Sequence, residues 1–142
     1  MRAHGICLAT FIILTTASDL RVAAAAEAVA VLGEAEQRFP AFCDSWMRRL
    51  AAREEFNQRN IKWRERGSEV EGVYIGYSSD HTCTVKTSKP TGVPVGRMVY
   101  HEYRYRKRGS AADTAAASKG EVVDKVEITE IFRYTAAGEW VY

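Results

Sequence analysis

The sequence predicts an α+β domain, in which an N-terminal helix packs on a curved antiparallel sheet of five or six strands. Residues 27–59 are rich in Ala, Glu, Arg and Leu, which are good helix formers. After residue 60 the apolar residues recur at every second position, which is typical of strands. Short turns separate most of these strands, so consecutive strands should pair antiparallel. A chain of 142 residues suffices for one such domain.

The first 26 residues have the organisation of a secretory signal peptide. A short basic start, Met1–His4, precedes an uncharged and mostly apolar run, Gly5–Ala17, and four alanines at 23–26 supply the cleavage site. Cleavage is expected after Ala25 or Ala26, with a cut after Ala17 as the alternative. The alternative is an uncleaved membrane anchor, but the apolar run is shorter than the roughly 20 residues that cross a bilayer, and no second apolar run approaches that length. The mature chain is therefore predicted to have no transmembrane span and to be secreted or periplasmic.

The mature chain is predicted to comprise an alanine-rich helical lead-in, residues 27–40, and a single α+β domain, residues 41–142. Pro40 marks the boundary, because proline is accepted in the first turn of a helix and not in its interior. The main helix is expected from Ala41 to about Gln58. Its apolar positions form one stripe at helical spacing, with Phe56 as an optional extension: Phe42, Cys43, Trp46, Met47 and Leu50.

The strands are expected from alternating apolar residues and from turn signals between them. A turn at 78–80 should divide two of them, the loop Gly109–Gly120 should be mobile, and a tight turn at 136–138 should precede the last strand. The expected strands are Asn60–Arg66, Val70–Tyr77, Thr82–Thr87, Arg97–Lys107, Glu121–Thr135 and Trp140–Tyr142.

Two of the three cysteines, Cys43 and Cys83, remain after the predicted cleavage. In an exported protein such a pair predicts a disulfide, with two buried thiols as the alternative. Cys43 lies on the apolar stripe of the helix, and Cys83 lies on the apolar face of its strand beside Val85. Both cysteines should therefore point inward, where one bond would join the helix to the sheet.

A helix followed by a long curved antiparallel sheet resembles the cystatin-like and NTF2-like folds. The segment Val126–Tyr134, followed by Gly138, Glu139 and Trp140, is similar to the closing hairpin of NTF2-like proteins, in which an apolar strand turns through a glycine and re-enters with a tryptophan. The chain departs from that family in having no clear second and third helices. Because the family includes isomerases, dehydratases and non-catalytic binding domains, the resemblance implies a fold and no single function.

Glu130 and His101 are the candidate catalytic residues. Alternation places Glu130 on the same face as Ile128 and Phe132, where desolvation would favour an acid or base role. Either a bulge near Thr129 that turns Glu130 outward or a partner such as Arg97 or Arg104 would make it structural. If the face of the preceding strand that carries His101 is buried, His101 and Glu130 could meet in an apolar cup and transfer a proton. If the other face is buried, His101 is a surface residue.

The densest basic stretch is the second candidate site, because arginines interleaved with aromatic rings can hold an anionic polymer, headgroup or sugar. The alternative is a strand end whose charges prevent edge pairing. The stretch comprises Tyr103, Arg104, Tyr105, Arg106, Lys107 and Arg108.

The sequence predicts neither a metal site nor a cofactor. The mature chain has two histidines, His81 and His101, which are far apart, and it contains no glycine-rich phosphate loop. A formal net charge of +2 together with an export signal argues against nucleic acid as a partner.

The function that this pattern favours is a small exported, non-enzymatic binding domain for an unidentified ligand or envelope partner. An NTF2-like isomerase or hydratase is one alternative, and a basic module that anchors to anionic surfaces is another. The sequence leaves a homodimer open.

Overall fold

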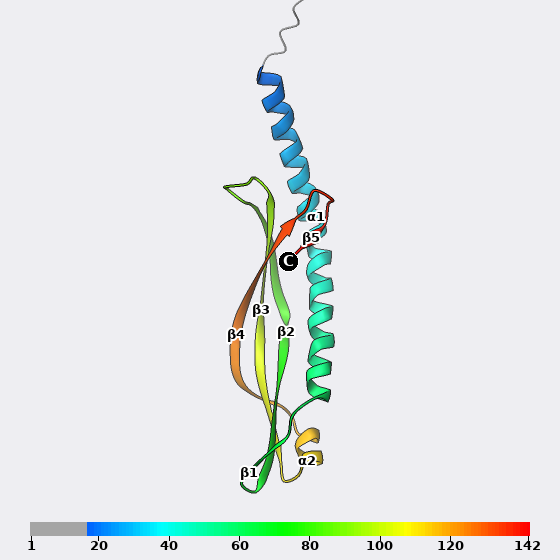
Figure 1. Ribbon diagram of the computed structural model, residues 1–142, viewed down its shortest axis with the longest axis vertical. Helices are drawn as coiled ribbons and strands as arrows, with labels where there is room; N and C mark the ends of the chain where they lie inside the picture. The colour runs from blue at the N-terminus through cyan, green and yellow to red at the C-terminus, as the bar shows by residue number, and fades with distance from the viewer. Residues whose placement is uncertain (1–16) are drawn as a thin grey trace, which may run out of the picture.

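The computed structural model describes residues 17–142 and places one long helix beside an antiparallel sheet (Figure 1). The sheet has five strands in the order β1-β2-β3-β4-β5, so every strand pairs with its neighbours in sequence. This arrangement confirms the predicted α+β class, and the curled sheet is compatible with a cystatin-like or NTF2-like fold. The elements are α1 (Ala17–Arg59), β1 (Arg64–Arg66), β2 (Glu69–Thr87), β3 (Pro94–Gly109), α2 (Ala112–Ala117), β4 (Glu121–Tyr134) and β5 (Trp140–Val141).

Helix α1 continues without interruption through Pro40, where the sequence predicted a boundary. A proline inside a helix removes one backbone hydrogen bond and costs roughly 3 kcal/mol. Packing on both sides offsets this cost, because Ala35 and Phe39 before the proline are as fully buried as Cys43 after it. The predicted lead-in therefore contributes two residues to the core. Most of the predicted apolar signal segment, Gly5–Ala17, lies outside the described residues.

The first turns of α1 project beyond the end of the sheet (Figure 1). Residues 21–31 are all exposed. None of the helices in the described part of the chain is both long and apolar enough to span a membrane.

Strand β2 is a single strand of 19 residues, so the predicted turn at 78–80 is wrong. Tyr77 pairs with Glu102 and His81 with Tyr100, which makes the intervening residues a bulge. The Ser78 hydroxyl accepts a hydrogen bond from the His101 N–H at 3.0 Å and donates one to the Asp80 carbonyl at 2.7 Å. These bonds replace part of the interrupted ladder, so the strand continues and the sheet has five strands.

The connection between β3 and β4, predicted to be a mobile loop, contains the short helix α2. The Thr114 hydroxyl accepts a hydrogen bond from the Ala111 N–H at 2.9 Å and closes the first turn. Ala115 is buried against the backbone of Gly109, and a side chain at that glycine would collide with it. The helix thus folds back on the end of β3.

The core lies between α1 and the sheet and is rich in aromatic residues. Phe39 is its centre: its ring lies 4.5 Å from that of Trp140 and 6.1 Å from that of Phe132. On β3 the buried face is the one that carries Met98, so the face that carries His101 points away from the core. Of the predicted helical stripe, Cys43 and Leu50 are fully buried and three members are partly buried, whereas Phe56 is 59% exposed. The buried cluster comprises Ala35, Phe39, Cys43, Leu50, Met98, Tyr100, Phe132, Tyr134 and Trp140.

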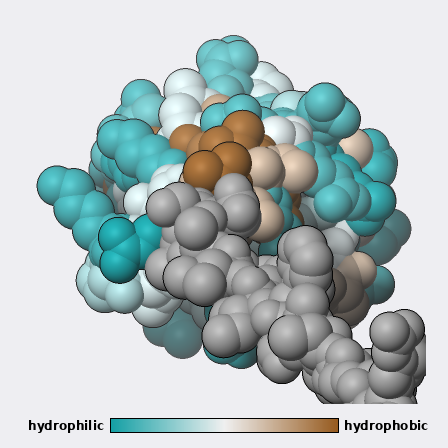
Figure 2. Space-filling view, turned by 90° about the horizontal axis from the view of Figure 1, so that it is seen from above, coloured by the Kyte–Doolittle hydropathy of each residue, from teal (hydrophilic) through white to brown (hydrophobic). Residues whose placement is uncertain are grey.

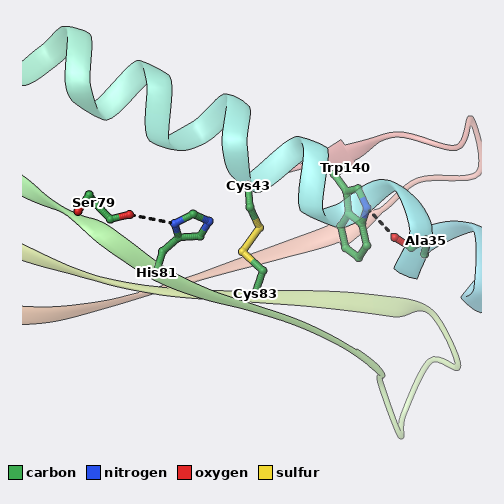
Figure 3. The surroundings of a disulfide bond; sticks show 6 residues. All are labelled: Ala35, Cys43, Ser79, His81, Cys83 and Trp140. Atoms are coloured by element: carbon green, nitrogen blue, oxygen red, sulfur yellow. Dashed lines mark hydrogen bonds between the residues drawn. A yellow bond between two sulfur atoms is a disulfide. The ribbon is translucent and has the colours of Figure 1, made fainter.

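Two links, one disulfide and one hydrogen bond, hold α1 to the sheet near this core (Figure 3). Cys43 of α1 forms the predicted disulfide with Cys83 of β2, with their Cα atoms 6.8 Å apart. The Trp140 indole N–H donates to the Ala35 carbonyl at 3.3 Å. Both links join segments that are distant in the sequence, so they fix the helix along the sheet.

Side chains of α1 also bond to the backbone of β2 beyond the short strand β1. The Glu54 Oε2 atom accepts a hydrogen bond from the Tyr77 N–H at 2.9 Å, and the Asn57 Nδ2 atom donates one to the Ile75 carbonyl at 2.9 Å. These bonds satisfy two backbone groups that β1, which pairs only with residues 69–71, does not reach. The helix therefore covers this edge of β2 at residues 75 and 77.

Candidate functional site

Glu130 lies on the core side of β4, opposite Met98 of β3, as alternation predicted. It is half-buried, and its Oε1 atom accepts a hydrogen bond from the Tyr100 hydroxyl at 3.2 Å. Burial raises the pKa of Tyr100 to about 12, and the negative charge of Glu130 adds to the rise. Glu130 also raises the pKa of Tyr142 through a hydrogen bond. The partner of this carboxylate is thus a tyrosine and not one of the arginines considered from the sequence.

His101 and Glu130 occupy opposite faces of the sheet. His101 pairs with Glu127 across the β3–β4 ladder, whereas Glu130 pairs with Met98, and these two pairs point to different sides. The structure therefore does not bring the two candidate catalytic residues together. His101 instead borders a shallow hollow on the outer face, together with His81 and Glu127.

The predicted basic stretch on β3 is divided by contacts within the chain. Arg106 and Arg108 both approach Glu121, at 3.1 and 3.7 Å. The Lys107 Nζ atom donates to the Ala116 carbonyl of α2 at 2.8 Å. Tyr105 stacks on Tyr74 with ring centroids 5.0 Å apart, and Tyr103 lies beneath the Lys125 ammonium. Most of the stretch therefore supports the fold, and Arg104 is the member that remains for binding.

Arg104 contributes to a hollow at the β1 end of the sheet, which we call the basic cleft. It has a volume of about 340 Å³. Its four basic side chains come from two segments, since three belong to alternate residues at and before β1 and the fourth belongs to β3. The basic cleft is lined by Lys62, Arg64, Arg66, Glu71, Gly72, Val73 and Arg104.

The charge of the basic cleft is strongly unbalanced. Glu71 is the one acidic residue in its lining, and its Oε1 atom already accepts from the Arg66 Nε atom at 3.0 Å. Arg64, Lys62 and Arg104 are exposed and turn toward the same hollow. Because like charges that converge on a hollow raise its potential, the basic cleft is suited to an anion.

The alternation in residues 60–66 indicates this cleft, but the basic site predicted from the sequence was the denser run at 103–108. In the segment NIKWRER the apolar Ile61 and Trp63 alternate with the basic residues. In the structure both apolar side chains pack over Gly72, where a side chain would collide with them. The alternation therefore buries one side of the segment and leaves the basic side for the cleft.

A third hollow lies at the opposite end of the molecule, between the first turns of α1 and the connection from β2 to β3. It has a volume of about 400 Å³, and its lining includes Ala28, Val31, Val93 and Pro94. Figure 2 shows this end from above, with hydrophobic atoms gathered in the middle of a hydrophilic surface. The lining is mainly apolar and offers little that would orient a polar ligand.

Within residues 17–142 no three His, Cys, Asp or Glu side chains lie close enough to hold a metal ion. Comparison of the chain with protein-family models, curated proteins and solved structures finds no match.

Proposed function

We propose that the protein is a small exported, non-enzymatic binding domain that holds an anionic group of its ligand in the basic cleft. One observation carries the proposal: four basic side chains converge on a hollow whose one carboxylate is already paired with Arg66. The arginines can each present two parallel N–H donors, which suit the oxygens of phosphate or carboxylate. The ligand class is thus an envelope component that bears such groups.

The size of the basic cleft supports a small anionic group rather than a whole ligand. A volume of about 340 Å³ is near the lower end of the range that small-molecule pockets span. The rest of a larger ligand would extend over the neighbouring surface of β1 and β2.

Two features support export. The disulfide between Cys43 and Cys83 belongs in an oxidising compartment, and the N-terminal segment has the pattern of a signal peptide. The enzymatic alternative has less support, because His101 and Glu130 lie on opposite faces of the sheet.

Calorimetric titration of the purified protein with pyrophosphate at low salt tests the proposal. Arg64→Gln and Arg104→Gln should each weaken binding by about tenfold, because a hydrogen bond to a charged group is worth roughly 1.5–3 kcal/mol. The matched control is Arg48→Gln, which removes an exposed arginine of α1 outside the lining of the cleft.

Binding should also weaken as salt is raised, since at ~1 M ionic strength the screening length falls to roughly 3 Å. An affinity that Arg48→Gln lowers as much as Arg64→Gln does would refute a specific cleft. An absence of pyrophosphate binding at low salt would refute the anion site itself.

A further inference from the structure

We infer that β4 is an interaction edge for a second copy of this chain, and that two β4 strands pair antiparallel to join two sheets into one. The inference is independent of the basic cleft.

The free side of β4 is long. The strand pairs with β3 along one side, but on its other side only Arg133 and Tyr134 pair, with β5. Among the residues that the structure describes, no strand pairs with this side of residues 121–132. Unpaired backbone N–H and C=O groups on such an edge are a template for another strand.

The surface of β4 carries exposed large apolar side chains among its charged ones. Val122, Val123, Val126 and Ile131 are large apolar residues that are between 39% and 53% exposed. No other strand of the described chain carries so many. Burial of such residues favours association, since roughly 25 cal/mol is gained for each Å² of apolar surface removed from water.

The opposite edge of the sheet, formed by β2, is protected at residues 69–71, 75 and 77. There β1 pairs with β2, and Glu54 and Asn57 of α1 bond to backbone groups farther along the strand. Natural sheets usually cover or blunt their edges in such ways. In the described chain β4 has no such contact along residues 124–132, so this stretch is a site for strand addition.

The regular part of the free edge has defined limits. Arg104 pairs with Asp124 but Tyr105 pairs with Val122, so Val123 is a bulge. At the other end β5 begins to pair at Arg133. Residues 124–132 remain as a regular stretch, and Ile128 is its central residue.

Charge and the length of the stretch together favour one register for two copies. A two-fold axis perpendicular to the sheet keeps each face continuous, so one residue of β4 must lie opposite its own copy. An axis at Val126 would avoid opposing like charges but would pair only residues 124–128 of the regular stretch. An axis at Glu127 would place this carboxylate opposite its own copy. An axis at Thr129 would place Lys125 opposite Arg133, a like charge on a residue whose edge β5 already occupies. Like charges directly opposite each other destabilise a sheet.

An axis at Ile128 avoids both conflicts. Ile128 then lies opposite its copy, Lys125 lies opposite Ile131, and Glu127 lies opposite Thr129. This register uses the whole regular stretch without opposing like charges. The strand is thus compatible with itself, and this compatibility favours a second copy over an unrelated partner.

Sedimentation velocity of the purified chain over a wide concentration range tests the inference. The wild type should show a concentration-dependent dimer. Ile131→Lys places a lysine opposite Lys125 twice in each dimer and should raise the dissociation constant by roughly tenfold. Ile131→Glu should lower it, because the new carboxylate meets Lys125. The matched control is Val29→Lys, a change at a 71% exposed apolar residue of α1 that should leave the dimer unaffected.

Charge reversal separates a specific register from misfolding. Adding Lys125→Glu to Ile131→Lys should restore the dimer, whereas a folding defect would persist in the double variant. A monomer at every concentration would overturn the inference, as would a dimer that Ile131→Lys does not weaken. Equal effects of Ile131→Lys and Ile131→Glu would overturn the register.

Discussion

Removal of the Cys43–Cys83 disulfide should lower the free energy of unfolding by about 4 kcal/mol. The two cysteines are 40 residues apart in the sequence. The chain-entropy relation for a closed loop of about this length gives roughly 13 cal/mol/K, which is about 4 kcal/mol at room temperature. Small domains are stable by roughly 5–15 kcal/mol, so this one bond accounts for a large fraction of the total.

The assay is chemical denaturation followed by tryptophan fluorescence, because Trp140 is buried and Trp46 packs against the core. The wild type should be compared in oxidised form, in reduced form, and as the Cys43→Ala/Cys83→Ala variant. The reduced wild type retains both sulfur atoms, so its decrease in the free energy of unfolding reports the effect of the cross-link alone. The alanine variant adds the cavity at Cys43, which is only 1% exposed, and should be somewhat less stable.

The unfolding midpoint should move to lower denaturant, and the denaturant dependence should become steeper because the unfolded chain without a cross-link is more expanded. The fall in Tm should be on the order of 15 °C for a chain of this size. If oxidised and reduced protein unfold at the same midpoint, the bond does not constrain the unfolded state and the reasoning fails.

Three further outcomes are expected. Gly96→Ala should lower the free energy of unfolding by roughly 1–3 kcal/mol, because the new methyl group meets the ring of Phe39. Gly33→Ala has open space and should raise it by about 0.5–1 kcal/mol, because alanine favours the helix. Equal effects in thermal unfolding would contradict this packing. Tyr100 should titrate near pH 12 in ultraviolet difference spectra, so its contribution to the stability of the fold is complete below pH 10 and is lost as pH rises through about 12. Glu130→Gln should lower the pKa of Tyr100, and an unchanged titration would show that the carboxylate does not act on the tyrosine. Deletion of the first 26 residues should leave the Tm unchanged, because residues 21–26 are exposed on the projecting turns of α1. A large fall would show that this segment belongs to the fold.

The sequence predicted the parts of the fold that depend on periodicity. The helical stripe around Cys43 and the alternation beside Cys83 each placed a cysteine on the core face, in agreement with the disulfide predicted from the cysteine pair. The alternation along β4 likewise placed side chains on the core face. Glu130 was placed on the core side by the same alternation. Such patterns are local, so they can be recognised without knowing what packs on them.

The features that the sequence did not predict depend on contacts between distant segments. Pro40 remains inside α1 because the residues on both sides of it are held by the sheet. The residues at 78–80 form a bulge because the Ser78 hydroxyl meets the backbone of β3, which no local pattern shows. The basic cleft needs Arg104 beside a segment more than 35 positions earlier, and only the pairing of β1, β2 and β3 brings them together.

If two copies join through β4 as inferred, the bonds from Glu54 and Asn57 to the backbone of β2 make further growth at the other edge less favourable. A sheet with two open edges can lengthen without end, because each added copy offers a fresh edge to the next. In the inferred dimer both β4 edges are used, and side chains of the helix occupy part of the remaining edge. A copy that joins through β4 would then present no equivalent edge outward, so growth should stop after a single addition without nucleating a fibre.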